Sequence, residues 1–212
     1  MSAERVLEVR RLGRTRYADA HALQQDLLAR RVDGRVGDVL VLTEHDPVVT
    51  VGRGAGLETA GAVKVPVVAV ERGGEATFHG PGQIVGYPIV LLDEGRRDLH
   101  RWLRDLEEVV IATLAEFEVV GHREAGFTGV WIGGKKVCSI GVAVRRWVTW
   151  HGFALNVNTD LAGFRAFQPC GLDPDVMTRL ADHVGRPLEM IEVEDALVRH
   201  VVRILGFDAA AR

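Results

Sequence analysis

Two cysteines are the candidate nucleophiles of this 212-residue chain. Cys170 stands between Pro169 and Gly171, outside any helical or strand pattern, and chemistry is often carried by such loops on a rigid scaffold. Cys138 lies in an apolar run whose pattern favours a packed, unreactive thiol. A thiolate attacks acyl groups once a neighbouring base has taken its proton. Cys170 is therefore the preferred nucleophile, with Cys138 as its rival.

A lysine is the candidate base. Lys135 and Lys136 follow the turn-like pair Gly133-Gly134, where a lysine is usually a solvated charge. If Lys136 instead pointed along a sheet into a pocket, desolvation would lower its pKa toward neutrality and make it a usable base. Because Lys136 and Cys138 are two apart, a strand would place both on one face. Spacing alone therefore also permits a pair with Cys138.

A glycine-rich segment at 72–83 carries several polar side chains. Its four glycines and one proline predict a loop rather than a regular element, and glycine lets the backbone approach a ligand closely. The segment has neither a P-loop ending nor a dinucleotide fingerprint. An ordinary surface loop is the alternative, but Arg72, Thr77, His79 and Gln83 within one stretch favour a substrate loop.

A second histidine opens the segment 151–158. His79 and His151 do not have the spacing of paired metal ligands, and the sequence offers no obvious third ligand, so no metal is predicted. A single histidine at the start of a strand is usually structural. A histidine–cysteine dyad that uses either residue remains an open alternative.

The elements that must position these residues are strand-like runs and a few amphipathic helices. Apolar or alternating runs predict strands at 6–9, 38–42, 48–51, 65–70, 84–92, 129–132, 137–144 and 150–157. Apolar stripes predict helices at 16–31, 98–117, 175–184 and 192–205, and a loop is expected at 54–64. This order predicts a single α+β domain over residues 1–212, with helices packed against a mixed or antiparallel sheet.

Composition limits the class of protein. The chain is 47% hydrophobic and 26% charged, with a net charge of −3, which indicates a soluble globular protein without general attraction to nucleic acid or anionic membranes. No secretory signal is recognisable, and no apolar run approaches the roughly 18 residues of a membrane span. Two cysteines form no disulfide framework. A cytoplasmic protein without nucleic-acid or membrane partners is expected.

Four motifs follow one another along the chain: Arg72-Gly-Gly-(x)3-Phe78-His79-Gly-Pro-Gly-Gln83, Lys136-(x)3-Ile140-Gly141, His151-Gly152-x-Ala154-Leu155-Asn156 and Pro169-Cys170-Gly171. In order and spacing they resemble the lipoyl(octanoyl) transferases, and the resemblance covers essentially the whole chain. Phe78 stands where that family usually has tyrosine, and Val-Cys-Ser follows Lys136 where Ile-Ala-Ala is common.

The resemblance implies the fold of the biotin/lipoate protein ligases without their adenylation chemistry, and a catalytic dyad of Cys170 and Lys136. It implies transfer of an octanoyl group from acyl carrier protein to a lysine of a lipoyl domain, in 2-oxoacid dehydrogenase E2 subunits or the glycine-cleavage H protein, with no cofactor. His151 and Asn156 would support the site. The implied substrate-binding residues are Arg72, Gly73, Gly74, Glu75, Ala76, Thr77, Phe78, His79, Ser139, Ile140, Gly141, Gly152, Phe153 and Ala154.

Two other functions compete with this one. An ATP-dependent lipoate or biotin protein ligase would share the glycine-rich region but would have no use for the Pro-Cys-Gly loop. A non-catalytic module that binds carrier proteins would form complexes without becoming acylated. In the transferase reading, Arg53, Arg145 and Arg146 are candidates for docking the acidic carrier.

Overall fold

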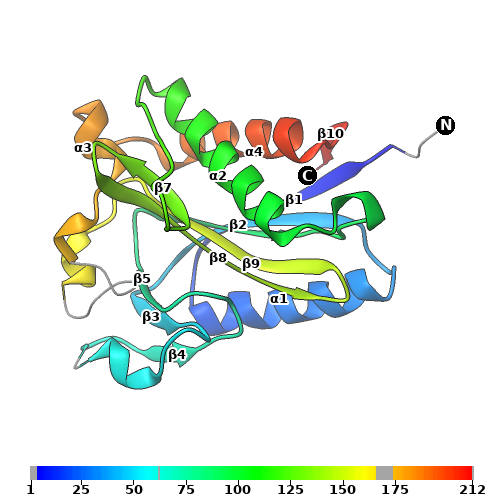
Figure 1. The fold of residues 1–212 in the computed structure, drawn as a ribbon, viewed down its shortest axis with the longest axis horizontal. Helices are drawn as coiled ribbons and strands as arrows, with labels where there is room; N and C mark the ends of the chain where they lie inside the picture. The colour runs from blue at the N-terminus through cyan, green and yellow to red at the C-terminus, as the bar shows by residue number, and fades with distance from the viewer. Residues whose placement is uncertain (1–3, 62, 166–173, 212) are drawn as a thin grey trace.

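The computed structural model of the chain describes residues 4–61, 63–165 and 174–211 (Figure 1). The strands are β1 (Val6–Thr15), β2 (Asp38–His45), β3 (Val48–Val51), β4 (Val67–Ala69), β5 (Ala76–His79), β6 (Gln83–Ile89), β7 (Gly129–Ile132), β8 (Lys135–Arg145), β9 (Val148–Asn156) and β10 (Ala209–Ala211). The α-helices are α1 (Tyr17–Val32), α2 (Leu99–Glu116), α3 (Leu180–Val184) and α4 (Met190–Leu205). Short 3-10 turns lie at Leu57–Ala60, Glu94–Arg96, Leu161–Phe164 and Pro174–Val176.

The strands form two sheets. The larger sheet has the order β10-β1-β2-β6-β9-β8-β7, in which β1 runs parallel to both β10 and β2 while the remaining neighbours are antiparallel. The smaller sheet has the order β4-β3-β5. The predicted mixed sheet is therefore confirmed, whereas a separate small sheet was not expected from the sequence.

Helices cover both faces of the larger sheet, with α1 on one face and α2 and α4 on the other (Figure 1). Strand β2 shows why. Its side chains alternate, so Val39 and Val41 pack with the α1 cluster while Leu40 and Leu42 pack with the α2–α4 cluster. All four are fully buried, as expected for an apolar run with no polar face.

The glycine-rich segment contains a regular element, contrary to the prediction. Residues Ala76–His79 form β5, which pairs antiparallel with β3. The glycines flank this stretch, and its Ala-Thr-Phe-His sequence contains two residues with good strand propensity. Only the residues on either side are irregular. The predicted loop therefore consists of two irregular stretches, 72–75 and 80–82, joined by a strand.

The helix predicted at 175–184 is also wrong in its first half. Only Leu180–Val184 is α-helical, and it is preceded by the extended residue Arg179. Met177 pairs with Lys136 as an isolated parallel bridge, and the Thr178 amide donates to the Lys136 carbonyl at 2.9 Å. Tertiary pairing with β8 outweighs local helical propensity here.

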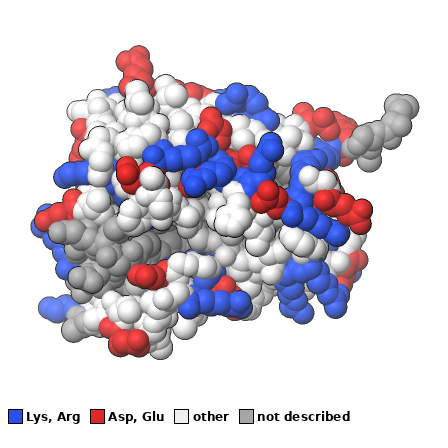
Figure 2. All heavy atoms as spheres, in the orientation of Figure 1, with Lys and Arg blue, Asp and Glu red and all other residues white. Residues whose placement is uncertain are grey.

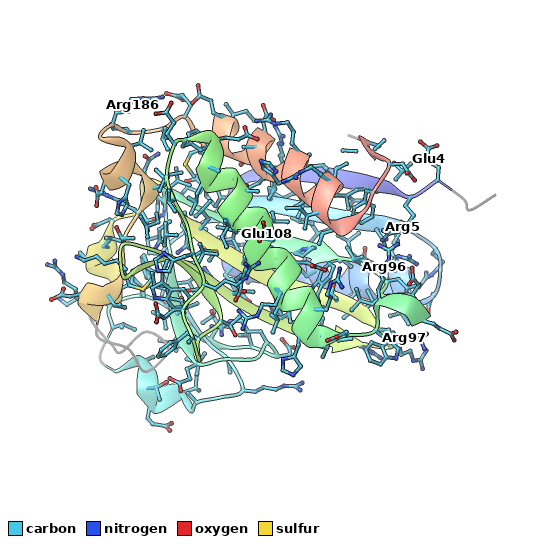
Figure 3. All side chains as sticks on the ribbon, turned by 45° about the horizontal axis from the view of Figure 1, so that its top comes forward. Glu4, Arg5, Arg96, Arg97, Glu108 and Arg186 are labelled. Carbon is cyan, nitrogen blue, oxygen red and sulfur yellow. The ribbon has the colours of Figure 1, made fainter. Side chains whose placement is uncertain are left out.

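Charged side chains of both signs are interspersed over the face shown in Figure 2. Some serve the fold: Arg5 and Arg96 lie near each other beyond the end of α4 (Figure 3), and each donates to the Leu205 carbonyl at 3.0 Å. Cations at a helix C-terminus stabilise its unpaired carbonyls. Within the described residues, no helix is long and apolar enough to cross a membrane. The cytoplasmic location stays a prediction.

Candidate active site

A pocket lies where the small sheet meets the large one. Its wall comes from the start of α1, the glycine-rich segment, and strands β5, β6, β8 and β9, and the space between its lining atoms, open mouth included, is about 470 Å³. The lining residues are Tyr17, Arg72, Gly74, Thr77, His79, Val85, Tyr87, Ser139, Ile140, Gly141, His151, Gly152, Phe153 and Ala154.

Most of the residues expected to bind substrate are among these. Gly73, Glu75, Ala76 and Phe78 belong to the same segment but do not line the pocket. Phe78 instead packs edge-on against Phe164, with ring centroids 5.5 Å apart, in the core of the small sheet. The pocket also contains Tyr17, Val85 and Tyr87, which sequence reasoning missed because nothing in their local pattern sets them apart from core residues.

Two glycines let the backbones close around the pocket. Gly141 and Gly152 are directly paired on β8 and β9. A Cβ atom on Gly141 would lie 2.9 Å from the Gly73 carbonyl oxygen, and one on Gly152 would lie 2.2 Å from the Gly86 carbonyl oxygen. The Gly73 amide in turn donates to the Val142 carbonyl at 3.0 Å. Larger residues would therefore push the glycine-rich segment and β6 away from the pocket floor.

A buried hydrogen-bond chain begins at Arg72. Its Nη2 donates to the Thr50 carbonyl at 2.9 Å and to Thr50 Oγ1 at 3.0 Å, while Nη1 donates to the Gly73 carbonyl at 3.0 Å. Thr50 Oγ1 lies 3.2 Å from His79 Nε2. The guanidinium therefore joins the glycine-rich segment to β3 and β5 instead of extending into solvent, and its side chain is buried.

The chain continues from His79 through Gln83 to Asn156. His79 Nδ1 is 2.8 Å from Gln83 Oε1, and Gln83 Nε2 donates to the Phe78 carbonyl at 3.1 Å and to Asn156 Oδ1 at 2.9 Å. Asn156 Nδ2 donates to the Thr178 carbonyl at 3.0 Å. The amide oxygen of Gln83 can only accept, so Nδ1 of His79 carries the proton. Nε2 of His79 then accepts from the Thr50 hydroxyl, and an imidazole with a single proton is neutral.

Burial, assisted by the nearby His45, lowers the pKa of His79 to about 3. The neutral form required by the hydrogen bonds is thus also the form favoured by the environment. We call Arg72, Thr50, His79, Gln83 and Asn156 the closed network, because a continuous chain of hydrogen bonds joins their side chains.

Lys136 is buried, with a relative exposure of 3%, whereas its neighbour Lys135 is exposed. Its Nζ lies over the Trp131 ring, 5.0 Å from the centroid. Gly129, at φ +136°, permits this position, because a Cβ there would be 2.9 Å from Lys136 Cε. The Gly129 amide donates to the buried Glu107 carboxylate at 3.1 Å. The usual expectation of a solvated lysine is therefore wrong for Lys136.

The proposed nucleophile Cys170, with Pro169 and Gly171, lies outside the described residues. The chain that follows it is placed beside Lys136, through the bridge from Met177 and the hydrogen bond from Thr178. The closed network ends at this same point, on the Thr178 carbonyl.

The rival cysteine is enclosed in the core. Cys138 has no exposed surface, and its Sγ lies 3.6 Å from the Ser139 carbonyl oxygen. Burial raises the pKa of the Cys138 thiol to about 12, so that it is protonated at neutral pH. Val130 of β7 pairs with Cys138, and a shift of register between Val130 and Trp131 marks a bulge at this point in the pairing of β7 with β8.

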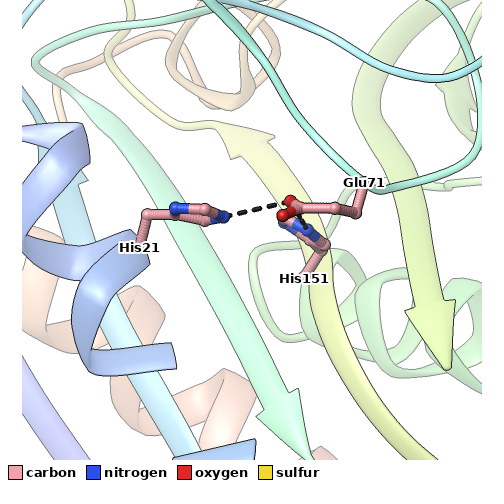
Figure 4. Close-up of side chains that lie close together, drawn as sticks. All are labelled: His21, Glu71 and His151. Carbon is pink, nitrogen blue, oxygen red and sulfur yellow. Dashed lines mark hydrogen bonds and ion pairs between the residues drawn. The ribbon is translucent and has the colours of Figure 1, made fainter. Parts of the chain in front are cut away.

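A second group of polar side chains lies beside the pocket: His21 on α1, Glu71 before the glycine-rich segment, and His151 on β9 (Figure 4). His21 Nε2 and His151 Nε2 lie 3.1 and 3.5 Å from Glu71 Oε2. Burial raises the pKa of Glu71, but hydrogen bonds from its own amide and from His21 outweigh this and hold the pKa below its ordinary value. We call these three residues the open cluster.

Sequence reasoning missed His21 and Glu71. The only local signal is that His21 follows Tyr17 by one helical turn, so both face the same side of α1, with rings stacked at 5.7 Å. His151 has a positive φ of 54°, which is uncommon for a residue with a side chain. His79 and His151, considered together as ligands from the sequence, lie instead in separate groups.

Comparison with known proteins agrees with this architecture. Residues 16–202 match the family model described as the lipoyl protein ligase A/B catalytic domain. An octanoyltransferase of Rubrobacter xylanophilus is 48% identical over 210 residues, covering 94% of each chain. One of Gloeobacter violaceus is 52% identical over 179 residues, covering 83% of this chain and 81% of the relative.

Among solved structures, a lipoate-protein ligase A bound with ATP superposes with a TM-score of 0.74 at 18% identity, covering 99% of this chain and 87% of the ligase. This likeness concerns the fold and confirms the predicted α+β architecture. Family membership rests on the family model and on the octanoyltransferases. The chain therefore belongs to the octanoyltransferase family within the lipoyl protein ligase A/B catalytic domains.

Proposed function

We propose that this chain transfers an octanoyl group from acyl carrier protein to a lysine of a lipoyl domain, with Cys170 as nucleophile and Lys136 as proton carrier. The acceptors would be E2 subunits of 2-oxoacid dehydrogenases and the glycine-cleavage H protein. One catalytic domain over residues 1–212 would suffice, in the cytoplasm and without a cofactor. The observation that carries the assignment of Lys136 is its burial, together with its pairing to the chain that follows Cys170.

The reaction divides into two acyl transfers. Lys136 takes the thiol proton of Cys170, and the thiolate attacks the carbonyl carbon of the octanoyl thioester. The bond to the carrier's sulfur breaks, that sulfur receives the proton from Lys136, and Cys170 holds the octanoyl group as a thioester. The amine of the acceptor lysine then attacks this thioester, loses a proton to Lys136, and releases the Cys170 sulfur.

The energetics need no nucleotide. Exchange of one thioester for another is nearly isoenergetic, and formation of the amide is downhill. The two steps predict ping-pong kinetics. Val85, Ile140, Phe153 and Ala154 give the pocket an apolar wall that suits an alkyl chain. At about 0.8 kcal/mol for each buried methylene, such a wall senses chain length without enforcing it sharply.

The direct test is to incubate the protein with octanoyl-acyl carrier protein and to map the acylated peptide by mass spectrometry. We expect one octanoyl group on the peptide that contains Cys170, and none after Cys170→Ser. Cys138→Ala is the matched control and should acylate normally, because this thiol is buried and protonated. An adduct on Cys138 would overturn the assignment.

Lys136 is tested by Lys136→Met, which keeps the length and removes the charge. We expect transfer to fall by roughly 10²–10⁴-fold, the usual contribution of a proton-transfer group. Lys135→Met is the matched control, since its exposed side chain contacts solvent, and it should retain activity. Unfolding curves of both variants show whether the fold is intact. Normal turnover by folded Lys136→Met would remove the residue from the mechanism.

The alternatives predict different requirements. An ATP-dependent ligase would modify the acceptor with free octanoate and ATP, and a binding module would form a complex without acylation. We expect transfer from the carrier-bound donor alone. The exposed Arg53, Arg145 and Arg146 are candidates for docking the acidic carrier, and their replacement should weaken binding more at low salt than at high salt.

A further inference from the structure

The open cluster brings three metal-binding groups together from distant parts of the chain. One ring nitrogen each from His21 and His151 and a Glu71 carboxylate oxygen all lie within 4.8 Å of one another. The three come from α1, β9 and the residue before the glycine-rich segment, so the fold itself creates the arrangement (Figure 4). Two imidazole nitrogens and one carboxylate are a ligand set typical of zinc and related transition-metal ions.

The distances suit a four-coordinate ion. Bonds of 2.0–2.1 Å from a tetrahedral metal to nitrogen and oxygen place neighbouring ligand atoms about 3.3 Å apart. The distances from Glu71 Oε2 are 3.1 Å to His21 Nε2 and 3.5 Å to His151 Nε2. The two edges to Glu71 therefore match a tetrahedral ion, the edge between the two imidazoles is at most 4.8 Å, and a fourth position would be open to water.

His151 gives a second observation that points to a ligand at this site. Its exposure is 2%, and its buried Nε2 has no hydrogen-bond partner within the described residues. The ring cannot easily turn away, because it stacks on Trp150 with centroids 4.3 Å apart while its backbone amide donates to Gln24 Oε1 at 3.1 Å. A buried polar atom left unpaired is costly, and an ion bonded to Nε2 would relieve that cost.

The surroundings allow an ion to enter. The side chains of His21 and Glu71 are 20% and 36% exposed, so the cluster opens to solvent on their side. Arg72 is the nearby charge that opposes a cation. Its Nη1 and Nη2 donate to the carbonyls of Gly73 and Thr50, which turns the guanidinium into the closed network. The carboxylate of Glu71 is left to balance the charge of the ion.

We propose that His21, Glu71 and His151 form a binding site for a divalent transition-metal ion of the zinc class. The site goes beyond the acyl-transfer function and does not depend on it. A bound ion would join α1 to β9 and to the start of the glycine-rich segment, at the wall of the pocket that contains His151.

The test is to titrate tag-free, acyl-free protein with Co²⁺, followed by displacement with Zn²⁺. We expect one equivalent of Co²⁺ with the strong visible absorption of tetrahedral nitrogen and oxygen coordination. Replacing a residue that only supports a metal ligand typically weakens metal binding by roughly 10–100-fold. Because His21→Gln and Glu71→Gln each remove a ligand, each should weaken Co²⁺ binding by at least that factor. His122→Gln is the matched control, because His122 Nε2 also lies near a carboxylate, 3.9 Å from Glu124 Oε2. This variant should bind Co²⁺ as the parent does.

The thiol of Cys170 is a rival ligand, and the same titration on Cys170→Ser separates it. Retention of the equivalent in Cys170→Ser supports the open cluster, and its loss overturns the proposal. Binding that survives both His21→Gln and Glu71→Gln, or no binding at micromolar metal, overturns it as well. As a second readout, Zn²⁺ should raise the unfolding temperature of the parent and of His122→Gln, but not of His21→Gln. None of these measurements uses transfer activity.

Discussion

The closed network and the open cluster border the same pocket but differ in how their polar atoms are satisfied. In the closed network, each nitrogen of His79 has a partner, at 3.2 and 2.8 Å. In the open cluster, His151 Nε2 is equally buried but makes no hydrogen bond within the described part of the chain, and Glu71 Oε2 lies 3.5 Å from it. A buried network whose polar atoms are all hydrogen-bonded holds its side chains in one arrangement, whereas a buried polar atom without a hydrogen bond is available to a ligand.

This difference indicates separate tasks for the two groups. The closed network connects the glycine-rich segment to β3, β9 and the chain beside Lys136, so it serves to fix the shape of the pocket. The open cluster contains no hydrogen bond that joins one strand to another. We infer that the first contributes to stability in the absence of any ligand and the second mainly when an ion is bound.

The largest expected effect comes from breaking the closed network at its centre. Gln83→Ala leaves buried groups of Phe78, His79 and Asn156 without partners. Each such loss costs about 1–3 kcal/mol, so the three together should lower the free energy of unfolding in urea by at least about 3 kcal/mol. Gln25→Ala, on the exposed side of α1, is the matched control and should change it by less than about 0.5 kcal/mol. A loss in Gln83→Ala no larger than in Gln25→Ala would contradict the structural role.

An intermediate effect should appear on acidification. Burial lowers the pKa of His79 to about 3 and that of His45, whose ring lies 5.7 Å from His79, to about 4. When the pH falls below the ordinary histidine pKa of about 6.5, these histidines become protonated in the unfolded chain but stay neutral in the folded chain. Stability is therefore lost as the pH falls from about 6 to 4, by about 1.4 kcal/mol per pH unit for each of these histidines.

His45→Gln isolates one of these protons. Comparing urea unfolding of the parent and the variant between pH 7 and pH 5 should show a shallower pH dependence in the variant, since it lacks one of the histidines whose pKa the fold lowers. Equal slopes in the two proteins would mean that His45 titrates alike in the folded and unfolded chains.

The smallest effect is expected in the open cluster. His21→Gln removes a partly exposed pair with Glu71, and such pairs contribute about 0–1 kcal/mol. Measured without metal, the free energy of unfolding should change by less than about 0.5 kcal/mol. A loss as large as that of Gln83→Ala would show that the cluster is structural and would remove the contrast between the two groups.

Local patterns predicted most of the elements but not the pairing that interrupts them. The apolar run at 38–42 and the stripe at 98–117 became β2 and α2, since periodic burial leaves a clear mark in the sequence. The stretch at 175–184 was expected to be one helix, yet Met177 pairs with Lys136 instead. That choice depends on a strand far away in the sequence, which a local window does not contain.

The candidate site divides in the same way. The order of the motifs around Arg72, Lys136 and His151 was enough to indicate the family, because residue types at fixed spacing are a property of the sequence alone. The burial of Lys136 and the meeting of His21 with Glu71 were decided only by the tertiary structure. The first depends on the pairing of β8 with β7 and with Met177, and the second on the packing of α1 against the residues before the glycine-rich segment, so side chains from separate elements meet only once those elements are packed.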